Sequence, residues 1–163
     1  MDMKNRKIKN AVWIALLVTF VFYCFVLFLR LFVNGRVHGS FSQNIRRSNL
    51  IPFGTVYDYI EKVANDRINV STAVENLVGN LIAFFPMGCY LPCLFQRIRK
   101  LKPFCVIILG MLLVIELSQP LFGVGYFDID DIILNFAGAI AGYGMVHAPV
   151  INPILKKIYI YKL

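Results

Sequence analysis

The sequence is short of the side chains and motifs that most enzymes need. It holds two histidines among 163 residues, His38 and His147. It has no glycine-rich phosphate loop, and no serine or cysteine stands in a recognisable nucleophile motif. Internal repeats, low-complexity tracts and flexible Gly/Ser linkers are also absent, and the length suits a single domain over residues 1–163. These absences argue against the common nucleotide-binding and nucleophilic hydrolase classes.

The four cysteines do not form the disulfide framework of a small secreted domain, because all of them fall within or beside hydrophobic blocks. Cys89 and Cys93 are one helical turn apart, as in a metal-binding pair. No histidine or third cysteine lies at ligand spacing, however, and small residues are common where membrane helices pack. The pattern therefore favours helix packing over a metal site.

Hydrophobic residues dominate the chain and fall into four blocks. They make up 58% of the sequence, and the mean hydropathy is +0.67, whereas soluble domains are about 45–50% apolar. The blocks cover residues 11–33, 74–95, 104–122 and 132–150. Each is about 20 residues long, enough for a helix to cross roughly 30 Å of hydrocarbon. The sequence therefore predicts an all-α membrane protein with four transmembrane helices in a small bundle, the first too long for a signal peptide.

The basic residues predict how the chain is oriented. The formal net charge is +8, and the positive charges gather before the first block, between the second and third, and in the tail. With four spans these three groups lie on one side, which the positive-inside rule makes the cytoplasm. Both termini are then cytoplasmic, and the connections 34–73 and 123–131 face outward. Since the charge excess follows the topology, we expect no nucleic-acid partner.

Polar side chains occur where lipid is expected. A central aspartate in a membrane helix costs about 2.5–3.5 kcal/mol on insertion scales, so such groups tend to face partners. Helical spacing puts them on shared faces, and the path of the chain puts them at a similar depth near the outer boundary. We expect a polar pocket shared by spans two, three and four, formed by Asn76, Asn80, Glu116, Gln119, Asp128, Asp131 and Asn135.

Structural roles for the same residues remain open. Asp128 or Asp130 would also suit a helix N-terminus, and Asp130 points away from Asp128 and Asp131 in helical projection. The buried amides and Glu116 would also suit hydrogen bonds between helices, typically worth less than about 2 kcal/mol each. Gly138 and Gly142 continue the polar stripe and predict a close approach of another helix.

Prolines and glycines predict the breaks in the chain. Pro86 and Gly88 should weaken the second span midway, and Pro120 should end the third near the outer surface. In the 34–73 connection, Pro52 and Gly54 break the structure, and Thr55 is a candidate cap for a short helix over 56–64. That segment is either a helix lying on the outer membrane surface or an ordinary solvated loop.

Three segments together resemble the VanZ-like family of bacterial membrane proteins. They are "RRSNLIPF" (46–53), "NLVGNLIAFFPMGCYLP" (76–92) and "ELSQPLFGVGYFDIDDIILNFAGAIAG" (116–142). The resemblance implies a single VanZ-like membrane domain in the bacterial cell membrane. It also implies a role in the cell envelope, because the family's named member is an accessory glycopeptide-resistance protein associated with reduced susceptibility to teicoplanin.

Two functions compete on these grounds. The first is a non-enzymatic envelope protein, surrounded by membrane lipids, whose pocket binds a lipoglycopeptide or a lipid-linked cell-wall intermediate, with Arg47 and Asn49 contributing from the loop. It needs no cofactor. The alternative is a membrane enzyme on a lipid-linked phosphate substrate, in which Glu116 pairs with Asp128 or Asp131 for acid/base chemistry or the carboxylates hold Mg²⁺. The first is favoured, because no nucleophile–base set is visible. The sequence predicts no oligomeric state.

Overall fold

The computed structural model describes residues 3–33 and 40–157, so Arg36, His38 and Lys162 lie outside the described residues. Four long helical segments are long and apolar enough to cross a membrane: Lys7–Val33, Val70–Leu94, Leu101–Phe122 and Ile129–His147. The protein is thus an all-α membrane protein with four spans, as the hydrophobic blocks predict. The second, third and fourth spans each begin about three residues earlier than expected, because their first turns are polar.

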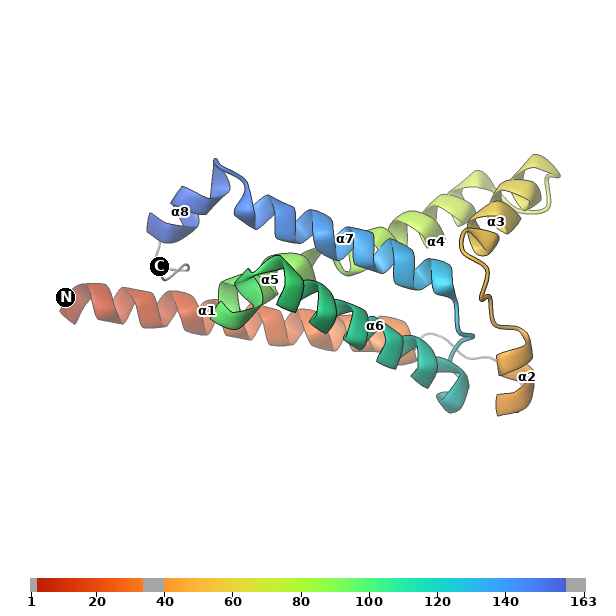
Figure 1. The fold of residues 1–163 in the computed structure, drawn as a ribbon, viewed down its shortest axis with the longest axis horizontal. Helices are drawn as coiled ribbons and strands as arrows, with labels where there is room; N and C mark the ends of the chain where they lie inside the picture. The colour runs from red at the N-terminus through yellow and green to blue at the C-terminus, as the bar shows by residue number, and fades with distance from the viewer. Residues whose placement is uncertain (1–2, 34–39, 158–163) are drawn as a thin grey trace.

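The spans consist of α1 (Met3–Phe28) with the π-helical turn η1 (Leu29–Val33), α4 (Val70–Ala83) followed by α5 (Phe85–Leu94), α6 (Leu101–Phe122) and α7 (Ile129–His147). The shorter elements are α2 (Phe41–Arg46), α3 (Gly54–Ala64), the 3₁₀ turn η2 (Gln96–Arg99) and α8 (Ile151–Lys157). In Figure 1 the spans run along one long axis, with α2 and α3 at one end and α8 near the beginning of α1 at the other. We call the first of these the α3 end.

Helix α7 is the centre of the bundle and packs against α4, α5 and α6, while α1 packs mainly against α5. Three glycines permit the closest approach. A side chain at Gly138 would overlap the carbonyl oxygen of Leu81, and one at Gly142 would overlap that of Phe85. Gly88 of α5 stands in the same relation to the carbonyl oxygen of Ala139. The prediction from Gly138 and Gly142 is confirmed, since small residues let helix backbones approach closely.

The second span breaks where its sequence predicts. Helix α4 ends at Ala83 and α5 begins at Phe85, with Pro86 in its first turn. Proline has no N–H to continue the helical ladder. The hydroxyl of Tyr23 on α1 donates to the carbonyl of Ala83, 2.6 Å away. The break therefore supplies a polar contact that ties α1 to the bundle.

The interior and exterior of the bundle are both apolar. Phe84, Phe104, Ile108 and Leu112 are fully buried. The outward faces still carry large apolar side chains. In the most hydrophobic stretch of the first span, only 6% of the residues are buried within the chain. A surface of this kind is stable in a lipid environment, in which exposed apolar side chains carry no hydration penalty.

The third span ends differently from the prediction. Pro120 lies inside α6, which continues to Phe122 and ends at Gly123. Gly123 has a φ of 66°, the left-handed conformation that glycine adopts at a helix end. The N–H of Val124 then bonds the carbonyl of Gln119 at 3.0 Å. Pro120 cannot donate an N–H, but only two helical residues follow it, and the helix ends at the left-handed Gly123.

A helix is present in the first connection, but its start also differs from the prediction. It begins at Gly54, and the residue before it, Phe53, is left-handed with a φ of 64°. Thr55 therefore does not cap the helix. Its N–H and those of its neighbours bond a carboxylate from another helix, as described below.

Candidate functional site

The start of α7 is held in place by side chains from three segments. Asp128 is its N-cap, and Asp128 Oδ1 accepts the N–H of Asp130 at 2.9 Å. Glu116 of α6 is buried, and its Oε2 accepts the N–H of Asp128 at 3.1 Å. The buried glutamate thus faces the start of α7 and not the lipid.

The segment before α3 pairs with the same turn. The N–H of Asn49 donates to the carbonyl of Phe127 at 2.8 Å, and the N–H of Ile129 donates to the carbonyl of Asn49 at 3.0 Å. The side-chain amide of Asn49 donates to Asp128 Oδ1 at 3.0 Å, and the hydroxyl of Thr55 donates to Asp128 Oδ2 at 2.6 Å. Both oxygens of Asp128 are therefore occupied by donors of the chain.

Asp130 fixes the position of α3. It is 1% exposed, and its carboxylate accepts three backbone N–H groups at the beginning of that helix. Oδ1 accepts from Phe53 at 2.5 Å, and Oδ2 accepts from Thr55 at 2.8 Å and Val56 at 3.2 Å. A carboxylate at a helix N-terminus satisfies orphan donors and interacts favourably with the helix dipole. Asp130 does act at a helix start, but that helix is α3 and not its own.

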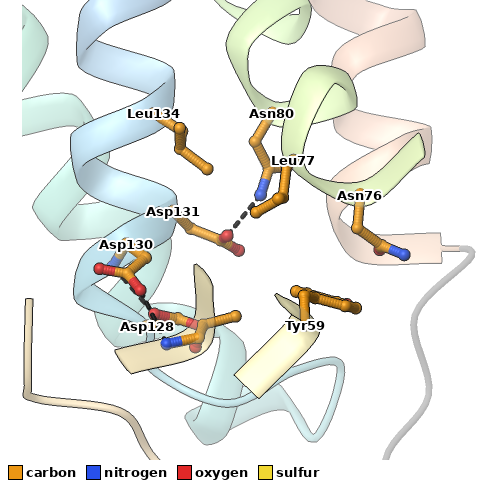
Figure 2. A pocket seen from close by; sticks show the side chains of 9 residues that line it. Tyr59, Asn76, Leu77, Asn80, Asp128, Asp130, Asp131 and Leu134 are labelled. Carbon is orange, nitrogen blue, oxygen red and sulfur yellow. Dashed lines mark hydrogen bonds between the residues drawn. The ribbon is translucent and has the colours of Figure 1, made fainter. Parts of the chain in front are cut away.

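Asp131 points in another direction, toward α4. Its Oδ1 accepts a hydrogen bond from the side-chain amide of Asn80 (Figure 2). Its Oδ2 has no hydrogen-bond donor among the residues that the structure describes. Asp131 is therefore the one aspartate of the three at the start of α7 that retains a carboxylate oxygen for a ligand.

These side chains surround a cavity of about 150 Å³ at the α3 end, which we call the polar chamber. Three helices, α3, α4 and α7, and the turn before α7 supply its walls. The lining residues are Thr55, Tyr59, Asn76, Leu77, Asn80, Asp128, Asp130, Asp131 and Leu134. Figure 2 shows Asn80 and Asp131 joined across it, with Tyr59 and Asn76 on the side of the chamber away from α7.

The chamber is acidic, because three carboxylates line it and no lysine or arginine of the described residues does. Burial of Tyr59, and then the charge of Asp131, raise the pKa of the Tyr59 phenol above its usual value of 10.0. Tyr59 is therefore a neutral hydrogen-bonding group at neutral pH. The guanidinium of Arg30 lies outside the lining, against Gly79 on α4.

Several of the expected pocket residues do not line the chamber. Gln119 is buried and packs against Gly125. Asn135 is also buried, and its Nδ2 donates to the carbonyl of Asp131 at 2.7 Å. Arg47 donates to the hydroxyl of Tyr126 at 3.1 Å on the surface.

The third wall of the chamber therefore differs from the expectation. Helix α3 forms the wall that was expected from α6. Glu116 of α6 bonds the N–H of Asp128 at the start of α7, and Asn49 bonds the Asp128 side chain, so neither of them lines the chamber. Of the expected set, Asn76, Asn80, Asp128 and Asp131 meet at the chamber, while Glu116, Gln119 and Asn135 lie behind it.

Sequence reasoning missed Thr55, Tyr59 and Asp130 as lining residues. Thr55 and Tyr59 are four residues apart, which places them on one face of a helix. The prediction for this segment rests on its apolar face alone, which indicates a helix at the membrane surface and gives no role to the face with Thr55 and Tyr59. Asp130 was assigned away from the pocket by treating residues 128–131 as regular helix, whereas Asp128 is an extended N-cap residue.

The donor set limits what the chamber can bind. Asp128 and Asp130 already accept hydrogen bonds from the chain, and no group of three or more His, Cys, Asp or Glu side chains in the described residues is arranged to hold a metal ion. The same part of the chain contains four free cysteines, among which Cys89 Sγ contacts the carbonyl of Gly142 at 3.6 Å. The accessible chemistry is hydrogen bonding at the second carboxyl oxygen of Asp131.

A family model described as VanZ/LLP1 matches residues 6–152, which include every helix around the chamber. The chain is also similar to a curated protein named "Protein VanZ", from Enterococcus faecium. The two are 28% identical over 113 residues, covering 66% of this chain and 68% of that protein. No solved structure matches the chain.

Proposed function

The chain belongs to the VanZ/LLP1 family, and on that premise we propose that it is an accessory protein of the bacterial cell envelope that lowers susceptibility to teicoplanin-type glycopeptides. In this proposal the chain acts by binding part of an amphiphile in the polar chamber. The amphiphile is either the lipoglycopeptide itself or a lipid-linked cell-wall intermediate.

The proposed orientation puts the polar chamber on the outer side of the cytoplasmic membrane and both termini in the cytoplasm. The basic residues support it. Arg97, Arg99, Lys100 and Lys102 lie in η2 and beside the beginning of α6. In Figure 1 the connection from α5 to α6 lies away from the α3 end. Short basic loops of this kind remain on the cytoplasmic side.

One observation carries the binding hypothesis: inside a cavity, Asp131 has one oxygen bonded by Asn80 and one with no donor from residues 3–33 and 40–157. A hydroxyl or ammonium group of a ligand would satisfy that oxygen, and charge-assisted hydrogen bonds are roughly twice as strong as neutral ones. Since no lysine or arginine lines the chamber in the part of the chain that the structure describes, a phosphate is disfavoured inside it.

The size of the chamber limits the part of the ligand that enters. Drug-sized ligands occupy pockets of about 300–1,000 Å³, so a cavity of about 150 Å³ holds only a polar fragment. The acyl chain of the amphiphile would lie along the apolar outer faces of the helices. A preference for acylated glycopeptides follows from this arrangement.

Growth inhibition tests the proposal. Expression of the chain in a glycopeptide-susceptible Gram-positive host should raise the inhibitory concentration of teicoplanin more than that of vancomycin, which lacks the fatty acyl tail. Equal shifts for the two drugs would contradict acyl-dependent binding.

Asp131→Asn tests the chamber itself, because the variant keeps the shape of the side chain but removes its charge. It should lose the teicoplanin shift while accumulating in the membrane at the wild-type level. Glu75→Gln is the matched control on α4, since Glu75 is exposed and does not line the chamber. If Asp131→Asn protects as well as Glu75→Gln, the chamber is not the working site.

A further inference from the structure

Helix α3 presents three different surfaces along its length. Thr55 and Tyr59 face the polar chamber. Asp58 and Glu61 are exposed and charged, and Asp58 pairs with Lys62 at 2.6 Å. The third surface is apolar. Around the helix, the chamber-facing surface is followed by the charged surface on one side and by the apolar surface on the other.

The apolar surface is unusually exposed for its composition. It combines α3 with the turn before it, and each of its five members is between 60% and 72% exposed. They are Leu50, Ile51, Phe53, Tyr57 and Ile60. Contiguous exposed apolar surface of this kind marks an interaction site. We call these five residues the α3 apolar face.

The rotation of α3 about its axis is fixed, so this exposure is a built feature. The three hydrogen bonds from Phe53, Thr55 and Val56 to Asp130 hold the first turn. The left-handed conformation of Phe53 is sterically unfavourable for a residue with a side chain, so the bond from its N–H to Asp130 helps to maintain it. The consequence is that the aromatic ring of Phe53 stays outward, 64% exposed.

We propose that the α3 apolar face is seated in the outer lipid interface, so that α3 separates the polar chamber from the acyl chains of the bilayer. The length of the second span supports a position of α3 at the depth of the lipid headgroups. Val70–Leu94 has 25 residues, about 37 Å of helix, which exceeds the roughly 30 Å hydrocarbon core. Its first turns, to which α3 is joined, therefore reach the headgroup region.

The side-chain chemistry fits the same position. A helix with a strong division between apolar and charged surfaces lies in the plane of the interface, and tyrosine is enriched at that depth. Apolar side chains at the same end of the spans are also exposed, among them Val70 and Phe122, which are 62% and 72% exposed. A contact between two copies of the chain through this face is disfavoured, because it would bring the exposed carboxylates of Asp58 and Glu61 close to the apolar interface.

Fluorescence of single-tryptophan variants tests the proposal. The chain has one tryptophan, Trp13, in the first span. In a Trp13→Phe background, Tyr57→Trp puts a probe on the α3 apolar face, and Asp58→Trp puts a matched probe on the charged surface at the next position of the same helix. Both proteins are reconstituted into phosphatidylcholine vesicles with bromine on the acyl chains near the headgroup, and iodide is the aqueous quencher.

Tyr57→Trp should be quenched by the brominated lipid and protected from iodide, and Asp58→Trp should show the reverse. Wild-type protein, with Trp13 alone, must be quenched by lipid, which establishes insertion independently of α3. Equal iodide quenching of the two α3 probes overturns the proposal in favour of a solvated helix. Protection of Tyr57→Trp from both quenchers overturns it in favour of a protein-covered face, such as a contact between copies. Neither result depends on antibiotic susceptibility, so failure here is distinguishable from failure of the proposed function.

Discussion

Replacing Asp130 with asparagine should release the first turn of α3, because the Asp130 carboxylate accepts the N–H groups of Phe53, Thr55 and Val56 there. An asparagine has one acceptor oxygen. It can retain either the bond from Phe53 or the pair from Thr55 and Val56, and its NH₂ group then faces the remaining N–H donor. The variant therefore loses at least one hydrogen bond to a charged acceptor and the favourable charge at a helix N-terminus.

The size of the effect follows from these losses. A hydrogen bond to a charged group is worth about 1.5–3 kcal/mol, and a carboxylate at a helix N-terminus about 0.3–1 kcal/mol. The local opening free energy of α3 should therefore fall by about 2–4 kcal/mol, and each 1.4 kcal/mol is a factor of about ten. Amide hydrogen exchange in residues 53–56, measured by mass spectrometry in lipid nanodiscs, should accelerate by about 30-fold or more, up to the rate of an unprotected amide.

Asp58→Asn is the control for this measurement. It removes one charge from the same helix and breaks the pair with Lys62, but exposed pairs contribute little, so exchange should change by about twofold at most. Peptides from the core of α7 should exchange at wild-type rates in both variants. If Asp130→Asn exchanges no faster than Asp58→Asn in residues 53–56, the carboxylate does not hold α3 in place.

Two further predictions test the packing and the chamber. Gly138→Ala should lower the stability in detergent by about 1–3 kcal/mol, because the added methyl overlaps the carbonyl of Leu81 and forces α7 away from α4. The control Gly144→Ala, whose added methyl meets no atom of the described residues, should not lower the melting temperature. A similar loss of stability in both variants would refute the contact. The phenol of Tyr59 should titrate above pH 10, because its pKa is raised by burial and then by Asp131; its contribution to stability is present below pH 10 and is lost as the pH rises through the folded pKa. The difference in phenolate absorbance between wild type and Tyr59→Phe measures this titration. Asp131→Asn should shift the titration to lower pH, because it removes a nearby carboxylate. A midpoint at or below pH 10 would contradict the burial of Tyr59.

The sequence was sufficient to predict the four spans, because runs of about 20 apolar residues have few other stable arrangements. It was also sufficient for the contact of Gly138 and Gly142 with a neighbouring helix, and for the break near Pro86. These predictions rest on local rules: length, the absence of a side chain, and the absence of an N–H.

The walls of the chamber were harder to predict, because they depend on which partner each polar group finds. Asp130 and Asp131 are adjacent in the sequence and chemically identical, yet one bonds the backbone of α3 and the other the side chain of Asn80. The projection of a regular helix placed Asp130 away from the chamber, since it took no account of the extended conformation of Asp128. Glu116 was expected in the pocket, but the N–H of Asp128 is its partner.

The pairing of Asn49 with Asp128 joins two segments that are 79 residues apart in the chain. During synthesis, the segment around Asn49 leaves the ribosome well before the turn that receives it. At about 5–20 residues per second, the interval is about 4–16 seconds. Throughout that interval Thr55 and the first N–H groups of α3 lack their aspartate acceptors, so the assembly of this end of the protein is timed by the arrival of the last membrane helix. A chain halted before Asp128 lacks both Asp128 and Asp130, so the beginning of α3 would have neither of its aspartate acceptors.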